Sequence, residues 1–265
     1  MDIRQFMARE GEKPLDNMVT DGGFCKIFRT IGFIGDSLSS GEFESTTPTG
    51  EKGYHDFYEY SWGQYIAREA GLTAYNFSKG GMSAKAFCEG FAETCGVYKP
   101  ENICQAYVMA LGVNDVLNQG QELGSVADIN LAGRYSNAPT FAGYYAQIIQ
   151  NLKTKQPQAR FFLMTMPRDN DEVKNQKKEA HAKLLYDMAE LFDYTYVLDL
   201  YQYGPVYDDE FRRNFYLGGH MNAAGYVLTS KMVMSYIDYI VRNNPEDFAQ
   251  VGFIGKPFHN LNAKW

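Results

Sequence analysis

The feature that most constrains this chain is the alternation of short, β-rich apolar runs with longer amphipathic stretches. The predicted strands lie at 28–34, 73–77, 106–111, 160–164 and 194–198. The helical patterns lie at 61–70, 83–91, 141–153, 170–192 and 223–241. Such alternation is typical of βαβ units with right-handed crossovers, and the nearly continuous apolar run at 106–111 suits a strand buried on both faces. We therefore predict an α/β fold, a three-layer α/β/α sandwich around a central, mostly parallel five-stranded sheet.

The chain shows no internal repeat or low-complexity linker, so we expect one domain over residues 1–265. Residues 1–25 are polar and irregular, and we predict that they form an N-terminal arm on the surface. The aromatic, Gly- and Pro-containing tail at 245–265 is expected to pack on the domain or on a partner, which allows a homo-oligomer. Two long loops, 41–60 and 118–139, follow predicted strand ends and could form the walls of a substrate cleft.

Composition excludes several classes of function. The net charge is −7, with 32 acidic against 25 basic residues, which argues against a nucleic-acid partner. The first residues contain no apolar core of signal-peptide length and no apolar run is long enough to span a bilayer, so we expect a cytoplasmic protein without a membrane partner. The four cysteines lack CxxC spacing, which favours free buried thiols over zinc ligands or disulfides, and no dinucleotide-binding GxGxxG opens a helix. We predict neither a metal nor a cofactor.

The first predicted strand ends in Gly35-Asp36-Ser37-Leu38. In an open α/β sheet, ligands bind at the carboxyl edge, so a serine at this position is a candidate nucleophile. Serine is a weak nucleophile unless a base removes its proton in the transition state. The rest of the chain must therefore supply a base and donors for a developing oxyanion.

The chain has four histidines, His55, His181, His220 and His259. The charged residues around His181 indicate a solvated helix face, whereas His220 lies in a loop that enters the last predicted helix. There Gly218 and Gly219 allow close backbone approach, and Asn222 can cap the helix. His220 is therefore the preferred base for Ser37.

Two segments offer oxyanion donors at predicted strand ends. Glycines Gly80 and Gly81 turn the chain after the second strand, and Asn114 projects a side-chain amide after the third. Each could equally be a simple turn or helix-cap residue. Asp36 and Asp115 are expected to fix these loops through backbone hydrogen bonds.

The chain thus contains four sequence blocks, around Ser37, Gly81, Asn114 and His220. In this order they resemble the four blocks of the SGNH (GDSL) hydrolase family, over about residues 28–240. The resemblance implies a flavodoxin-like three-layer sandwich and hydrolysis of acyl esters through a serine acyl-enzyme. It implies Ser37 as nucleophile and His220 as base. It also implies an oxyanion hole made of the Ser37 and Gly81 backbone N–H groups and the Asn114 side chain.

One position departs from the family. An acid usually precedes the histidine by three residues, and here that position is Leu217. Three alternatives remain open. A backbone carbonyl near Leu217 could accept the His220 Nδ1–H, a carboxylate of Asp208, Asp209 or Glu210 could reach in from the preceding loop, or the site could be degenerate and not turn over.

Substrate choice should depend on the loops around Ser37. The chain contains 20 Tyr and 18 Phe, and Tyr54, Tyr58, Trp62 and Arg168 could form a polar, aromatic cleft. Asp36 is a further substrate-binding candidate. Such walls favour a sugar, so we predict a carbohydrate esterase that removes acetyl groups from an oligosaccharide. The alternatives are a lysophospholipase or short-chain lipase acting on another small-molecule acyl ester, and a non-catalytic binding module.

Overall fold

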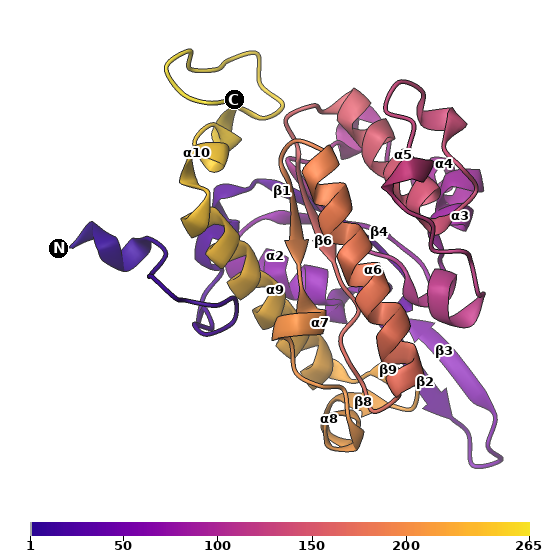
Figure 1. Ribbon diagram of the computed structural model, residues 1–265. Helices are drawn as coiled ribbons and strands as arrows, with labels where there is room; N and C mark the ends of the chain where they lie inside the picture. The colour runs from indigo at the N-terminus through magenta and orange to yellow at the C-terminus, as the bar shows by residue number, and fades with distance from the viewer. Residues whose placement is uncertain (1) are drawn as a thin grey trace.

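The computed structural model describes residues 2–265 and has a five-stranded, fully parallel sheet at its centre (Figure 1). In spatial order the strands are β4 (Thr73–Ser78), β1 (Thr30–Gly35), β5 (Ala106–Ala110), β6 (Arg160–Met164) and β7 (Thr195–Leu198). All five lie where the sequence predicts them. β4, the next sheet strand after β1 in the chain, pairs on one side of β1, and β5 pairs on the other, so the order of the strands reverses beside β1. Ligands of open α/β sheets bind at the carboxyl ends of the strands beside such a switch point.

Helices cover both faces of the sheet, as predicted. On one face lie α2 (Trp62–Ala70) and α9 (Ala223–Asn243), and on the other α5 (Phe141–Lys155) and α6 (Glu172–Leu191) (Figure 1). Each face has its own apolar core because neighbouring residues of a strand point to opposite sides. In β1, for example, Phe33 packs in the α2/α9 core, whereas Ile34 packs in the other.

The predicted helix at 83–91 is interrupted in the structure. It consists of α3 (Ala84–Ala86), a π-helical turn at Phe87–Phe91 and α4 (Ala92–Cys95). Gly90 within this turn has a non-helical backbone, which breaks the regular helix. The remaining short helices are α1 (Ser37–Ser40), α7 (Leu200–Tyr203), α8 (Asp209–Phe215) and α10 (Pro245–Phe248).

The expected loop at 41–60 instead contains an antiparallel hairpin, β2 (Glu42–Thr46) and β3 (Lys52–Asp56). Its strands are mostly polar and therefore lack the usual apolar alternation of a half-buried strand. Phe43 attaches the hairpin to the domain, with its ring 5.5 Å from that of Tyr226 in α9. The Tyr226 hydroxyl also donates to the Glu42 carbonyl oxygen at 2.6 Å. A second small hairpin pairs β8 (Tyr216–Leu217) with β9 (His220–Met221).

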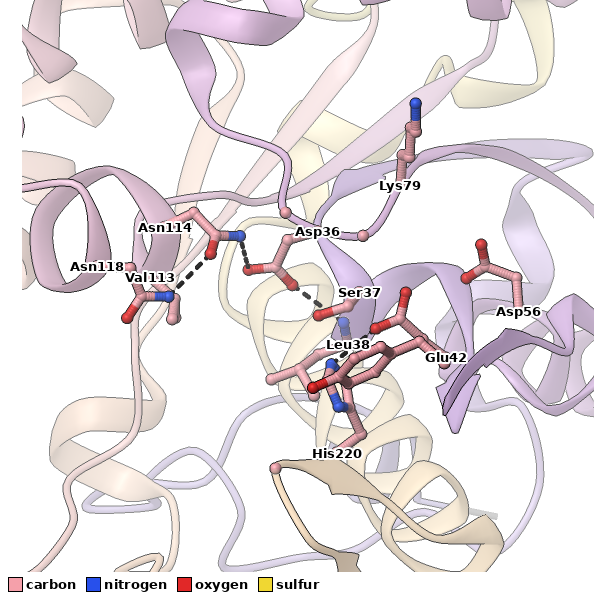
Figure 2. Close-up of a pocket in the computed structure, with 14 residues that line it drawn as sticks. Asp36, Ser37, Leu38, Glu42, Asp56, Lys79, Val113, Asn114, Asn118 and His220 are labelled. Atoms are coloured by element: carbon pink, nitrogen blue, oxygen red, sulfur yellow. Dashed lines mark hydrogen bonds and ion pairs between the residues drawn. The ribbon is translucent and has the colours of Figure 1, made fainter. Parts of the chain in front are cut away.

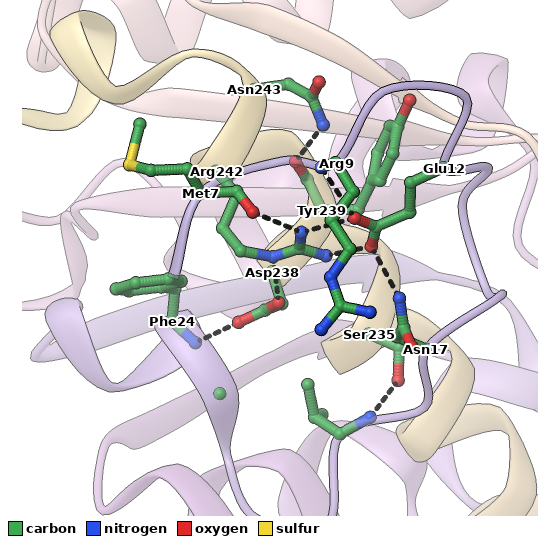
Figure 3. Close-up of polar contacts among 12 residues, drawn as sticks. Met7, Arg9, Glu12, Asn17, Phe24, Ser235, Asp238, Tyr239, Arg242 and Asn243 are labelled. Atoms are coloured by element: carbon green, nitrogen blue, oxygen red, sulfur yellow. Dashed lines mark hydrogen bonds and ion pairs between the residues drawn. The ribbon is translucent and has the colours of Figure 1, made fainter. Parts of the chain in front are cut away.

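The N-terminal arm lies along α9, held by polar contacts (Figure 3). The Arg242 guanidinium pairs with Glu12 at 2.6 Å and with Asp238 at 2.8 Å. The backbone N–H of Phe24 donates to Asp238 at 2.9 Å. Glu12 is thereby almost buried, and the hydrogen bond from Arg242 lowers the pKa of its carboxyl to about 2.

The C-terminal tail also packs against the domain. The Phe248 ring in α10 stacks on Tyr196 of β7, with 5.4 Å between ring centroids. The Arg29 guanidinium donates to the carbonyl oxygens of Gly252 and Ile254, at 2.8 Å each. Aromatic stacking and backbone hydrogen bonds together hold the tail on the α2/α9 side of the sheet.

The four cysteines are unpaired, as expected, and two of them are buried. Within residues 2–265, no helix has the length and apolar character needed to cross a bilayer. In the same part of the chain, no group of three or more His, Cys, Asp or Glu side chains is placed to hold a metal ion.

Candidate active site

Ser37 lies at the carboxyl end of β1, where the chain turns sharply into α1. Gly35 permits this turn, because a Cβ there would overlap the Ser39 side chain. Asp36 caps α1, its Oδ1 accepting the Leu38 N–H at 3.0 Å. The N–H of Ser37, at the first helical position, has no partner within the helix.

Ser37 opens into a cavity of about 530 Å³ at the edge of the sheet (Figure 2). The cavity is lined by Asp36 directly after β1, by α1, by the β2–β3 hairpin, and by the segments after β4, after β5 and around β9. The predicted residues Gly81, Asn114 and His220 all line it together with Ser37. The structure therefore brings the four sequence blocks to one site.

The glycine pair after β4 forms a tight turn. The Met82 N–H donates to the Lys79 carbonyl oxygen at 3.1 Å, and Gly81 has φ +72°, as the third position of a type II turn requires. Within residues 2–265, the Gly81 N–H has no acceptor. Fully buried Asp115 fixes the segment that follows the turn, because its Oδ1 accepts the N–H of Ala84 at the start of α3 at 2.8 Å. Asp115 is thus a turn-fixing residue, as the sequence indicates.

Asn114 follows β5 in a π-helical turn, Val113–Asn118. Its Nδ2 donates to the Met82 carbonyl oxygen at 3.1 Å. Nδ2 also approaches Asp36 Oδ2 at 3.5 Å, and Oδ1 accepts from Asn118 at 2.9 Å (Figure 2). A contact of 3.5 Å is a weak hydrogen bond. One amide hydrogen of Asn114 is therefore engaged, and the other lies toward Asp36 with only a long contact.

Asp36 lines the cavity and is almost fully buried. Burial, with smaller contributions from the charges of Asp115 and Glu42, raises the pKa of its carboxyl to about 7. Because its oxygens face the Leu38 N–H and the Asn114 amide, Asp36 holds the loop around Ser37. This arrangement agrees with the structural role that the sequence favours for it.

His220 lies between two carboxylates of the β2 strand. Its Nε2 is 2.9 Å from Glu42 Oε1, and its Nδ1 is 3.6 Å from Glu44 Oε2. Residues two apart on a strand point to the same face, so both carboxylates face the imidazole. Buried Nδ1 has no hydrogen-bond partner of good geometry among the described residues.

The acids expected from the preceding loop do not reach His220. Asp208 caps α8 by accepting the Phe211 N–H at 2.8 Å, and Asp209 accepts a long bond from Asn170 at 3.5 Å. Neither residue lines the Ser37 cavity, nor does Glu210. A backbone carbonyl near Leu217 is also not the partner, because Nδ1 has none among the described residues.

Glu42 and Glu44 are not among the residues predicted from sequence, because their segment is expected to be a loop and instead forms β2. The two residues differ in electrostatic surroundings. Glu44 accepts from Lys52 Nζ and from the Gly219 N–H, each at 2.7 Å, and these hydrogen bonds lower the pKa of its carboxyl. Burial raises the pKa of Glu42, although His220 opposes the shift. The sequence signal for these two residues is their Glu-x-Glu spacing, which places both side chains on one face of a strand.

Of the expected substrate-binding aromatics, only Tyr54 lines the Ser37 cavity. Its exposed ring meets His220 edge-on, with 5.5 Å between ring centroids. Tyr58 instead donates its hydroxyl to the Ala74 carbonyl oxygen, and Trp62 is buried against Phe33. The Arg168 guanidinium lies 5.8 Å from the Tyr201 ring centroid, outside the cavity lining.

A second cavity, of about 240 Å³, adjoins the first. The two share Leu38, Val113, Asn118 and Gly219 as lining residues. The walls of the second are mainly apolar and include three methionines, Met164, Met166 and Met221. An apolar space therefore begins beside the candidate nucleophile.

His181 is buried, contrary to the solvated position that its charged neighbours indicate. It projects from α6 toward the segment after β5, where its Nε2 would lie 2.7 Å from a Cβ at Gly112. Burial lowers the pKa of His181 to about 4. The helix is therefore charged on its outer face, while this histidine packs inward behind the Asn114 turn.

Comparison with known proteins agrees with this geometry. The family model of GDSL-like lipases and acylhydrolases matches residues 33–228. A family two carbohydrate esterase from Clostridium thermocellum, solved with cellohexaose, has a similar fold, with a TM-score of 0.56 and 16% identity over 87% of this chain and 66% of that one. The sequence has no significant match among curated proteins.

Two further solved structures are similar. A carbohydrate esterase family 2 enzyme with a carbohydrate-binding domain from Corynascus thermopiles (Myceliophthora fergusii) has a TM-score of 0.55 and 16% identity, covering 85% of this chain and 68% of that one. An acetyl xylan esterase, AlAXEase, has a TM-score of 0.51 and 14% identity, covering 78% and 99%. At these identities the similarity shows the shared fold.

Proposed function

Because the chain belongs to the GDSL-like lipase/acylhydrolase family, we propose that it is a serine esterase that removes acetyl groups from carbohydrates. The observation that carries this proposal is the single cavity in which Ser37, Gly81, Asn114 and His220 meet. It combines a nucleophile, a base and oxyanion donors, which are the parts that acyl transfer needs.

In the acylation step, Ser37 Oγ attacks the ester carbonyl carbon and its proton passes to His220 Nε2. Nε2 must first exchange Glu42 Oε1 for Ser37 Oγ, because Glu42 is its partner in the structure. The carbonyl electron pair moves onto oxygen, where the Ser37 and Gly81 N–H groups and the Asn114 amide stabilise the charge. The C–O bond to the alcohol then breaks, and His220 returns its proton to the departing oxygen.

Deacylation repeats these movements with water. His220 takes a proton as the water oxygen bonds to the acyl carbon, and the tetrahedral intermediate forms in the same oxyanion hole. Collapse breaks the bond to Ser37 Oγ, which receives the proton back from His220. Acetic acid leaves and loses its proton to solvent as acetate, and the free serine is restored.

The carbohydrate assignment rests on the walls of the cavity. Tyr54, Asp56, Lys79 and Asn118 line it, and together they present hydroxyl, carboxylate, ammonium and amide groups around Ser37. Such groups can hydrogen-bond a hydroxyl-rich alcohol, and the exposed Tyr54 ring offers an apolar face to a sugar ring. Two of the similar structures are carbohydrate esterases of family 2, and one was solved with cellohexaose.

The test compares acetylated xylo-oligosaccharides with 4-nitrophenyl acetate, using Ser37→Ala as the control. We expect acetate release from both substrates by the wild-type protein, a higher kcat/KM on the oligosaccharide, and loss of both activities in Ser37→Ala. Activity on the simple ester alone would contradict the carbohydrate assignment. A wild-type protein that neither hydrolyses activated esters nor reacts at Ser37 with a fluorophosphonate would instead be a binding module.

The apolar cavity beside Leu38 favours a second candidate, an esterase for longer acyl chains. Its methionine-rich walls could accept an alkyl chain attached to the carbonyl that Ser37 attacks. A series of 4-nitrophenyl esters from C2 to C12 separates the two functions. A preference for C8 or longer over acetate would favour the lipase-like function and contradict the acetyl esterase.

A further inference from the structure

We propose that Glu44, on strand β2, is the positioning residue that orients His220, in place of a carboxylate preceding the histidine. This inference rests on the proposed serine esterase function and identifies a group that the four sequence blocks do not contain. Its basis is the location of Glu44 Oε2, 3.6 Å from His220 Nδ1. No other carboxylate faces this nitrogen among the described residues.

The chemistry of the base requires such a partner. When His220 accepts the Ser37 proton at Nε2, the ring becomes a cation that still carries a proton on Nδ1. A carboxylate at Nδ1 selects the tautomer with Nε2 unprotonated and stabilises the cation as it forms. Nδ1 of His220 is buried and has no acceptor within hydrogen-bond distance, so an unpaired N–H would otherwise be costly. A small rotation of the ring toward Glu44 supplies that acceptor.

Glu44 is held ready for this role. Its side chain is only 5% exposed, and it accepts hydrogen bonds from Lys52 Nζ and the Gly219 N–H at 2.7 Å each. These donors keep the carboxylate ionised, as its lowered pKa reflects. A Cβ at Gly218 would lie 2.5 Å from Glu44 Oε1, so this glycine, two residues before the histidine, makes room for the carboxylate. The absence of an acid at position 217 and the two glycines that leave space for Glu44 are thus parts of one arrangement.

Glu42 is closer to the imidazole but on the wrong side for an orienting role. It contacts Nε2, the nitrogen that must receive the Ser37 proton, and it must leave for the reaction to begin. Its raised pKa also makes it the less suitable of the two to remain an anion beside a cationic ring. Glu44 leaves Nε2 free for Ser37, and Glu42 does not.

The experiment measures 4-nitrophenyl acetate hydrolysis and the rate of Ser37 labelling by a fluorophosphonate in four proteins. These are the wild type, Glu44→Gln, Lys52→Met and Asp208→Asn. Glu44→Gln keeps the size of the side chain and an acceptor for the Gly219 N–H but removes the charge. Lys52→Met breaks the hairpin ion pair and leaves the carboxylate at His220. Asp208→Asn makes the same carboxylate-to-amide change at the α8 cap.

We expect Glu44→Gln to lose at least about 100-fold in kcat and in labelling rate, with KM within threefold of wild type and thermal unfolding showing a folded protein. Lys52→Met should lose less than tenfold, and Asp208→Asn should match wild type. Equal losses in Glu44→Gln and Lys52→Met would assign Glu44 a merely structural role and overturn the proposal. Glu44→Gln with kcat within threefold of wild type would also overturn it. A wild-type protein without Ser37-dependent reaction would overturn this proposal and the esterase function together.

Discussion

The most direct test of the oxyanion hole is the substitution Asn114→Ala. In the structure, Asn114 Nδ2 donates to the Met82 carbonyl oxygen at 3.1 Å and lies 3.5 Å from Asp36 Oδ2. The first contact ties the Asn114 turn to the Gly81 turn. The second is weak enough for its hydrogen to move to an oxyanion above Ser37. Alanine removes both contacts, together with the 2.9 Å bond from Asn118 to Asn114 Oδ1, and leaves the backbone of the π-helical turn in place.

The expected losses of activity and of stability follow from these contacts. Loss of one oxyanion donor costs about 10²–10³-fold in kcat, or roughly 3–4 kcal/mol of transition-state stabilisation. The bonds of Asn114 to Met82 and from Asn118 are neutral, so their loss costs stability on the order of 1 kcal/mol each. The effect on catalysis should therefore exceed the effect on folding. Ser37 and His220 remain, so some activity above the Ser37→Ala background should persist.

The assay follows 4-nitrophenyl acetate hydrolysis under saturating substrate, with urea denaturation as the check on folding. Asn118→Ala is the matched control, because it removes the 2.9 Å bond to Asn114 Oδ1 and keeps the Asn114 amide, and the simple ester lacks the sugar that Asn118 is proposed to bind. We expect less than a tenfold loss there against at least 100-fold in Asn114→Ala. A folded Asn114→Ala protein with kcat within threefold of wild type would refute the role of this amide in the oxyanion hole.

Two further predictions concern stability and pH. The pKa of His181 is lowered to about 4 by burial, so its stabilising contribution is present above its ordinary pKa of 6.5 and is lost as pH falls toward 4. Between pH 7.5 and 5, urea denaturation should show that the wild type loses about 2 kcal/mol of stability that His181→Leu does not lose. Equal losses in the two proteins would contradict this prediction. The pKa of Glu12 is lowered to about 2 by Arg242, so its stabilising contribution is present above pH 4.5 and is lost as pH falls toward 2. Glu12→Gln should cost about 2 kcal/mol of stability at pH 7 in urea denaturation. A variant as stable as wild type at pH 7 would show that the Glu12–Arg242 ion pair contributes nothing.

The sheet could be predicted from sequence because its signals are local. Apart from Thr30 and Arg160 at their first positions, the runs that form β1, β5 and β6 are apolar, as expected when helices cover both faces. The parallel connections then require every strand to end at the same edge. Ser37, Gly81 and Asn114 follow three of these strand ends, so their meeting at one cavity was predictable without any side-chain geometry.

The partner of His220 could not be predicted in this way. Its position depends on a polar hairpin whose strands lack an apolar pattern and which is anchored by Phe43 against Tyr226, far along the chain. The side chains of Glu42 and Glu44 face the imidazole only once that packing sets the hairpin beside β9. The sequence by itself determined the parallel sheet, the common edge at which its strands end, and the serine that follows one of them. Tertiary structure alone decided which carboxylates meet the histidine, because contacts between distant segments depend on packing rather than on local residue pattern.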